Sequence, residues 1–338
     1  MIRAQLHLST LAAAEEGRPT FAQFDVPGWV WVAFLAFVAL LLFADLLIVH
    51  RKPHAISLRE AGIESAVWIS IGLAFTLVIL FWQGGGAAGE YLAGYLIEKS
   101  LSIDNVFVWA VILSYFAVPR EFQFRVLFWG IFGALVLRAI FIFTGVALIE
   151  RFDWVLYVFG AFLLFTAFRI ARHDEVEVHP ENNPILRVIR KVIPSTTEYD
   201  GQKLFTHVSG RMVATPLFAV LVMIETTDVV FAVDSIPAIL AVSREPFIVF
   251  SSNAFAILGL RALYFLLAGM AGKFRYLNLG LGVILAFVGV KMIIAEWYHM
   301  PIWLSLTVIA VVLTVTIFAS LRADRRQGAL DEAVPKAD

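Results

Sequence analysis

The chain has 338 residues, of which 60% are hydrophobic and 16% charged, with a formal net charge of −1. Soluble proteins contain about 45–50% apolar and about 25% charged residues, so this composition excludes an ordinary soluble globule and indicates an integral membrane protein. The net charge gives no basic footprint for nucleic acid, and the lack of cysteine excludes disulfides, thiolate metal sites and thiol redox chemistry.

Apolar windows along the chain predict the membrane spans. A helix needs about 20 mostly apolar residues to cross the roughly 30 Å of bilayer hydrocarbon. We therefore expect an all-α polytopic membrane bundle with about nine transmembrane helices. The expected spans are residues 29–49, 63–82, 94–118, 124–149, 153–170, 212–242, 247–269, 276–295 and 302–321.

The distribution of lysine and arginine predicts the orientation of these spans. Most lysines and arginines lie in the loops after the first, third, fifth and seventh spans and in residues 322–338. Cytoplasmic loops retain positive charge, so we expect residues 1–28 to form an extracytoplasmic tail and residues 322–338 a cytoplasmic tail. Tryptophans form the expected outer interfacial belt: Trp29, Trp31, Trp82, Trp154, Trp297 and Trp303.

A polar stretch divides the membrane region into two halves. We expect residues 29–170 to form the first half, residues 171–211 a cytoplasmic linker, and residues 212–321 the second half. Within the linker, PILRVIRKVI is basic and amphipathic, which is typical of a helix lying on anionic lipid. A solvated linker explains the stretch equally well.

The two halves contain an internal repeat. SIDNVFV (102–108), GALVLRAIF (133–141) and YVFGAFLLFTAFRI (157–170) recur as TTDVVFA (226–232), ILGLRALYF (257–265) and LGLGVILAFVGVKM (279–292). Spans three to five thus correspond to spans six to eight. Because three is odd, the copies enter the membrane from opposite sides, which is the inverted-repeat construction of many secondary transporters.

Ionisable residues inside the expected spans are costly in hydrocarbon and are therefore functional candidates. They are Asp45, Glu98, Lys99, Asp104, Arg138, Glu225, Asp228, Asp234, Arg261 and Lys291. Three of them also have structural explanations. Lys291 lies near a span end, where we expect it to snorkel; Asp45 could pair with the basic residues that follow it; and Lys99 could balance a carboxylate.

Carboxylates cluster in IETTDVVFAVDSIPAILA, residues 224–241. Glu225 and Asp228 share a helix face at i, i+3 spacing. Asp234 lies about 240° from Asp228 on a straight helix and joins them only if the segment bends. Pro237 supplies a cause for a bend, and the length of the window also suggests a broken or tilted element.

The matching span offers EKSLSIDN, residues 98–105, with carboxylate, hydroxyl and amide oxygens. Such ligands suit a hard divalent cation such as manganese, magnesium or calcium. The two acidic spans contain no histidine and the methionines form no cluster, which argues against copper and zinc. Arg138 and Arg261 are expected to balance the carboxylates, or to lock helix pairs in a purely structural role.

Six segments resemble the TerC family, most closely its Alx-like members. They are GYLIEKSLSIDNVFVW (94–109), GALVLRAIFIFTG (133–145), FDWVLYVFGAFLLFTAF (152–168), ATPL (214–217), FAVDSIPAILAV (231–242) and SNAFAILGLRALYFLLAG (252–269). The resemblance implies a bacterial inner-membrane protein of the LysE-type transporter group, associated with tellurite resistance and manganese efflux. It places the family's acidic positions on Glu98, Asp104, Asn105, Glu225, Asp228 and Asp234, with Asp45 as a further candidate.

These observations predict a manganese exporter with a midplane carboxylate site, charge-balanced by Arg138, Arg261 and Lys99. Calcium and magnesium are the alternative cations. We expect no enzymatic activity, no cofactor and no nucleic-acid partner. The alternative function is a membrane scaffold in a stress-response or secretion complex. Direct handling of tellurite suits the site poorly, because an oxyanion needs cationic or N–H donor surroundings.

Overall fold

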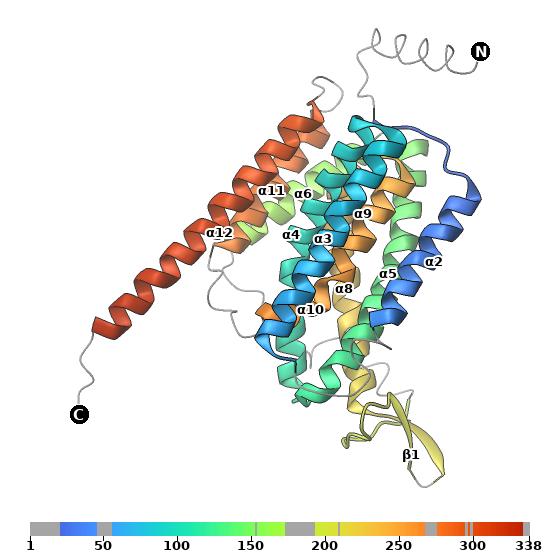
Figure 1. Cartoon of the computed structure of the whole chain (residues 1–338), viewed down its shortest axis with the longest axis vertical. Coiled ribbons are helices and arrows are strands. Elements are labelled where there is room, and N and C mark those ends of the chain that lie inside the picture. The colour runs from blue at the N-terminus through green and yellow to red at the C-terminus, as the bar shows by residue number, and fades with distance from the viewer. Residues whose placement is uncertain are drawn as a thin grey trace.

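The computed structural model describes residues 21–45, 56–152, 154–172, 193–208, 210–267, 276–294, 297 and 300–333. Helices dominate this part of the chain (Figure 1). The elements are α2 (Gly28–Ala44), α3 (Leu58–Gln83), α4 (Gly85–Tyr115), α5 (Arg120–Arg151), α6 (Val155–Arg172), β1 (Phe205–Val208), β2 (Arg211–Ala214), α8 (Pro216–Leu240), α9 (Pro246–Leu258), α10 (Leu260–Leu267), α11 (Leu277–Ile293) and α12 (Ile302–Ala333).

Taking α9 and α10 as one interrupted helix gives nine helical units in the described residues, one for each expected span. Five segments are long and apolar enough to cross a bilayer: residues 58–83, 120–151, 216–240, 246–267 and 303–320. α2 is a shorter apolar helix. α4 is long enough at 31 residues, but Glu90, Glu98, Lys99 and Asp104 interrupt its apolar sequence. The all-α polytopic membrane architecture predicted from the sequence is confirmed.

Local sequence explains where the helices begin. At the start of α3, Ser57 accepts a hydrogen bond from the Glu60 backbone, while the Glu60 carboxylate accepts from the Ser57 backbone. This reciprocal capping satisfies two donors that a helix end leaves open. Pro216 and Pro246 occupy first-turn positions of α8 and α9, where a missing N–H costs nothing. Gly84, at φ +89°, separates α3 from α4.

The packing of the helices follows the repeat. Under the repeat, α4 corresponds to α8, α5 to the α9–α10 unit, and α6 to α11. α4 packs against α9, and the equivalent pair α8 and α5 also packs together. α4 contacts its own equivalent α8, and α6 contacts its own equivalent α11. These contacts between equivalent helices are those that an inverted repeat predicts.

Glycines set the closest crossing in the bundle, between α6 and α11. A Cβ on Gly160 would lie 3.0 Å from the Gly289 carbonyl oxygen, and a Cβ on Gly289 would lie 2.9 Å from the Gly160 carbonyl oxygen. The two backbones therefore touch without a side chain between them. Small residues permit such close approach of membrane helices. α11 also packs against the long tilted α12 (Figure 1).

The expected sixth span begins later than predicted. Residues 211–214 form β2, which pairs antiparallel with β1, and α8 begins only at Pro216. The apolar run MVA fits a strand as well as a helix over so few residues, which is why its sequence did not separate the two. The hairpin projects beyond the N-terminal end of α8 (Figure 1). The basic stretch PILRVIRKVI lies outside the described residues, apart from Ile193 at its end.

The helix break lies in the expected seventh span and not in the sixth. α8 is one continuous helix of 25 residues with Pro237 in its last turn. The break falls at Gly259, between α9 and α10. A Cβ at this position would lie 2.8 Å from Cβ of Trp68 and 3.0 Å from Nζ of Lys99. Gly259 thus allows α3 and a lysine from α4 to approach the break.

Candidate functional site

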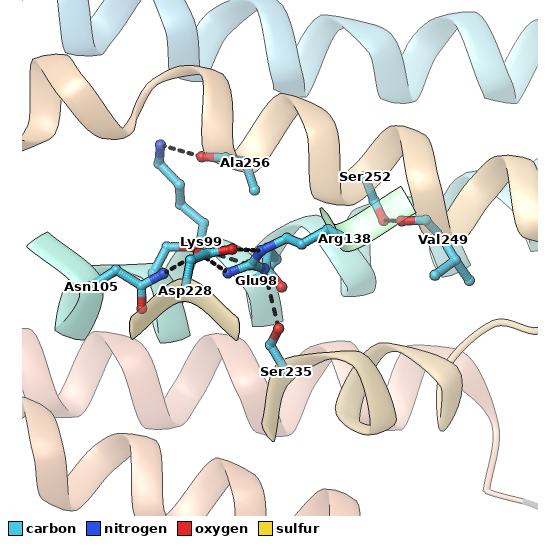
Figure 2. Close-up of polar contacts among 10 residues, drawn as sticks. Glu98, Lys99, Asn105, Arg138, Asp228, Ser235, Val249, Ser252 and Ala256 are labelled. Carbon is cyan, nitrogen blue, oxygen red and sulfur yellow. Dashed lines mark hydrogen bonds and ion pairs between the residues drawn. The ribbon is translucent and has the colours of Figure 1, made fainter. Parts of the chain in front are cut away.

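Arg138 of α5 lies at the centre of the candidate site and is 1% exposed. Its Nε donates to Oδ2 of Asp228 at 3.1 Å, and its Nη2 donates to Oδ1 of the same carboxylate at 2.9 Å. Its Nη1 donates to Glu98 and, at 3.2 Å, to the Ser235 hydroxyl. Figure 2 shows the guanidinium between these side chains. One arginine therefore joins a carboxylate of α4 to a carboxylate of the equivalent helix α8.

Helical spacing explains the α4 side of the site. Glu98, Ser102 and Asn105 are separated by four and then three residues, so they lie on one face of α4. The Ser102 hydroxyl donates to Oε1 of Glu98 at 3.2 Å. Nδ2 of Asn105 donates to Oδ1 of Asp228 at 3.4 Å, which brings the amide to the α8 carboxylate (Figure 2). Unwinding of α4 is not needed to bring Asn105 to this cluster.

Glu225 lies one helical turn before Asp228 and packs against Gly133 of α5. A Cβ at position 133 would overlap the Glu225 carboxylate, so a larger residue there would force this carboxylate to move. Gly133 and Arg138 are on the same helix, five residues apart. α5 therefore provides both space for one carboxylate and a cation for the other. Sequence reasoning missed Gly133 and Ser235; only the GALVLR repeat segment pointed to the first. Ser102 was among the hydroxyl residues that the EKSLSIDN segment offered.

Three buried oxygens around this cluster accept no hydrogen bond from the described residues. They are Oε2 of Glu98, Oδ1 of Asn105 and Oε2 of Glu225. A buried acceptor without a donor costs about 1–3 kcal/mol, more when it is charged. All three are the hard oxygen donors that divalent cations prefer. The cluster can therefore accept further positive charge or donors.

The described acidic and histidine side chains form no group of three that could hold a metal ion as they stand. The guanidinium of Arg138 occupies the space between Glu98 and Asp228. Glu98 and Asp228 share this one guanidinium. A cation that displaced it would meet carboxylate oxygens, which are ligands that divalent cations prefer.

Two predicted ligands are not part of the described cluster. Oδ1 of Asp234 accepts from the Thr166 hydroxyl of α6 at 3.0 Å, so Pro237 does not bring it to Asp228. Asp104 lies on α4, but its side chain is outside what the structure describes. Their assignment as metal ligands stays a prediction.

Arg261 of α10 forms a second buried ion-pair cluster, with partners outside the repeat. Its Nη1 pairs with Oδ2 of Asp45 of α2 at 2.5 Å, and its Nη2 pairs with Glu64 of α3. Its guanidinium also lies 4.0 Å from the centre of the Phe124 ring. Sequence reasoning missed Glu64, although it falls one residue inside the second expected span. Arg261 therefore balances Asp45 and not the α4–α8 carboxylates.

Lys99 and Lys291 each donate a hydrogen bond to a neutral oxygen. Nζ of Lys99 donates to the Ala256 carbonyl oxygen of α9 at 3.1 Å (Figure 2). It therefore satisfies a carbonyl near the end of α9, where a broken helix leaves acceptors open. Lys291 is 7% exposed and donates to the Ser305 hydroxyl at 3.1 Å, so the expectation that it snorkels is wrong.

Comparison with known proteins identifies the family. Residues 83–328 match the family described as "Integral membrane protein TerC family". The chain is 48% identical to "Uncharacterized membrane protein STKORF319" of Myxococcus xanthus over 94% of this chain and 99% of that protein. It is 46% identical to "Putative membrane-bound redox modulator Alx" of Escherichia coli (strain K12) over 88% of this chain and 97% of that protein. No solved structure matches. The chain therefore belongs to the TerC family of integral membrane proteins.

Proposed function

We propose that this protein transports a divalent metal cation across the bacterial inner membrane, and that its main activity is manganese efflux. The observation that carries the proposal is the contact of Arg138 with Glu98 and Asp228, one carboxylate from each half of the repeat. Inverted-repeat transporters bind their substrates between the halves near the middle of the membrane. The resemblance to manganese-exporting members of the family supports the choice of cation.

In this mechanism the substrate cation and the Arg138 guanidinium compete for the same oxygens. A cation that binds Glu98 and Asp228 displaces the guanidinium from one or both of them. The unpartnered oxygens of Asn105 and Glu225 then supply neutral and charged ligands nearby. When the cation leaves, Arg138 returns and compensates the carboxylates. The buried carboxylates therefore have a positively charged partner whether or not the cation is bound.

A cavity of about 460 Å³ supports access from the side of the linker. It lies between the end of α4, the start of α8 and the segment that precedes β1. Its lining includes the hydroxyl residues Tyr115, Thr196 and Thr215. α4 and α8 are the two helices that carry Glu98 and Asp228. A cation that enters between their ends reaches the carboxylates by following these two helices.

The name of the Escherichia coli relative includes a role as redox modulator. This chain contains no cysteine, so it has no thiol with which to exchange electrons. We propose transport and not catalysis as the basis of any redox effect, through the cellular concentration of a metal ion.

Manganese flux into proteoliposomes tests the proposal. Asp228→Asn removes the charge that Arg138 and the cation share, and we expect it to abolish flux while the protein remains folded. Asp200→Asn, in the linker, is the matched control and should transport like the wild type. Competition with calcium and magnesium tests the choice of cation. Unchanged manganese flux in Asp228→Asn protein would reject the proposal.

A scaffold without transport activity is the second candidate. The β1–β2 hairpin favours it, because Val208 and Met212 expose apolar side chains beyond the membrane helices. Exposed apolar residues of this kind can bind a protein partner. This function predicts that Val208→Ser with Met212→Ser abolishes a specific cellular complex, and that the purified wild-type protein shows no manganese flux.

A further inference from the structure

Residues 21–27 lead into α2 and form an extended segment, which we call the N-terminal strap. Figure 1 shows the strap as the dark blue stretch ahead of α2. The backbone N–H of Ala22 donates to Oε1 of Glu90 at 2.6 Å. The backbone N–H of Phe24 donates to Oε2 of Glu245 at 3.4 Å. Two carboxylates far apart in sequence therefore hold one short segment.

Aromatic contacts strengthen this attachment. The Phe24 ring meets the Trp82 ring edge to face, with centroids 5.5 Å apart, and Trp82 meets Phe247 in the same way at 5.6 Å. On the other side, the Arg244 guanidinium lies 5.1 Å from the centre of the Phe21 ring. Such contacts each contribute about 0.5–1.5 kcal/mol. The strap is thus bound by its side chains as well as its backbone.

The two carboxylates belong to different halves of the repeat. Glu90 is fully buried in the second turn of α4, in the first half. Glu245 precedes α9 and lies in the connection from α8, in the second half. The strap therefore joins the two halves at one end of the bundle. By the predicted orientation this end is extracytoplasmic.

We propose that the N-terminal strap closes the extracytoplasmic end of the transport path, and that each transport cycle releases it from the Arg244–Glu245 side. The inference rests on the proposed function, because alternating access moves one half of an inverted repeat relative to the other. A segment bound to both halves resists that movement. The strap leaves the Glu245 side first, because that hydrogen bond is the longer of the two.

Cross-linking tests this inference directly, since the chain has no native cysteine. Phe21→Cys with Arg244→Cys, joined by a short bifunctional thiol reagent, ties the strap to the second half. We expect manganese flux into proteoliposomes to fall at least tenfold and to return after reduction of a cleavable cross-link. Phe24→Cys with Trp82→Cys is the matched control, because it ties the strap to α3 on the side that stays attached. That variant should keep most of its flux.

The possible outcomes distinguish failure of the strap inference from failure of the proposed function. Full flux in the cross-linked Phe21→Cys and Arg244→Cys protein overturns the strap inference and leaves cation transport standing. Loss of flux in both cross-linked pairs also overturns it, because release would then not be confined to one side. Absence of flux in every unmodified protein rejects the proposed function.

A second measurement tests the strap without a flux assay. Maleimide labelling of the single variant Phe21→Cys should become at least threefold faster when manganese is added, because this partly buried side chain leaves Arg244 during release. A labelling rate that manganese leaves unchanged overturns the inference whatever the flux. Gln23→Cys is the control, because its side chain is exposed already and should label at one rate throughout.

Discussion

Arg138 shows how a single buried cation can join two halves of a membrane protein. It contacts a carboxylate of α4 and a carboxylate of α8 while its own helix is α5. Removing one partner from a buried ion pair is strongly destabilising, because the remaining charges have no water to compensate them. Its role in binding and its role in folding therefore depend on the same hydrogen bonds, and experiments must measure both.

We expect Arg138→Met to lower the free energy of unfolding by about 3–5 kcal/mol, because Glu98 and Asp228 lose their shared partner. Thermal unfolding in detergent measures the loss. Added manganese should stabilise this variant more than the wild type, since the guanidinium no longer competes for the carboxylates. Arg151→Met, at the exposed end of the same helix, is the control and should change little. A variant as stable as wild type and indifferent to manganese would contradict the competition mechanism.

Gly133→Ala should disturb the site by steric overlap alone. The added Cβ overlaps the Glu225 carboxylate, which must move. We expect a cost of about 1–3 kcal/mol in unfolding free energy, as for other overpacked cores, together with reduced manganese flux. Gly86→Ala is the control, because a Cβ there meets nothing within 4 Å. Equal flux in the two variants would show that the position of Glu225 does not matter.

At the scale of elements, the linker segment that precedes α8 is attached to the membrane helices. The Tyr199 hydroxyl donates to the Phe116 carbonyl oxygen at 2.6 Å, where α4 ends. Nε2 of Gln202 donates to the Glu121 carbonyl oxygen at 2.9 Å, in the first turn of α5. The segment therefore covers the turn between α4 and α5 and does not hang freely from α8.

Tyr199→Phe should loosen this attachment. Loss of one hydrogen bond costs about 1 kcal/mol, and it leaves the Phe116 carbonyl without its donor. Limited proteolysis should then cut residues 193–215 severalfold faster than in the wild type. Tyr115→Phe, at an exposed tyrosine, serves as the control. Equal cleavage rates in wild type and Tyr199→Phe would mean that the hydroxyl does not hold the segment.

The same hydroxyl predicts a pH dependence. Burial raises the pKa of Tyr199 above that of a free tyrosine, because the charged phenolate is less well solvated there. A pKa raised by folding contributes stability below the unfolded value and loses it as pH rises beyond that value. The attachment should therefore weaken above about pH 10. Proteolysis at pH 8 and pH 11 measures this, and Tyr199→Phe should show a smaller change between them.

The elements also show where sequence reasoning stops. The i, i+3 and i, i+4 spacing placed Glu225 beside Asp228 on one helix face, and the structure agrees because α8 is helical throughout that region. The spacing of residues along α8 did not predict the partner of Asp234, which accepts a hydrogen bond from Thr166 of α6. The break at Gly259 depends on Trp68 and Lys99 from other helices, so no local pattern could reveal it. Contacts between distant segments decide these details.

At the scale of the whole molecule, hydrophobic length and the repeat determine most of the architecture. Each of the nine expected spans falls on one helical unit of the described residues, because apolar runs of about 20 residues favour membrane helices. The repeat matched α4 with α8 and α6 with α11, and the two helices of each pair are in contact. It did not predict that Arg261 would bind Asp45 and Glu64, because α2 and α3 lie outside the repeat and their placement depends on tertiary packing.

The odd number of spans expected from the sequence would put the two ends of the chain on opposite sides of the membrane. We expect a single cysteine at Gln5 to react with a membrane-impermeant maleimide in intact spheroplasts. A single cysteine at Ala337 should react only after lysis. Labelling of both positions before lysis would contradict the odd count, and the reverse pattern would invert the orientation.

The bare backbone contact between Gly160 and Gly289 limits how the two halves can move. No side chain separates α6 from α11 there, so the helices cannot come closer, and widening the gap would open a void in the bundle. Rotation about the contact requires neither change. In the proposed transport cycle we therefore expect the crossing of α6 and α11 to act as the pivot, and a bulky residue at either glycine to displace it.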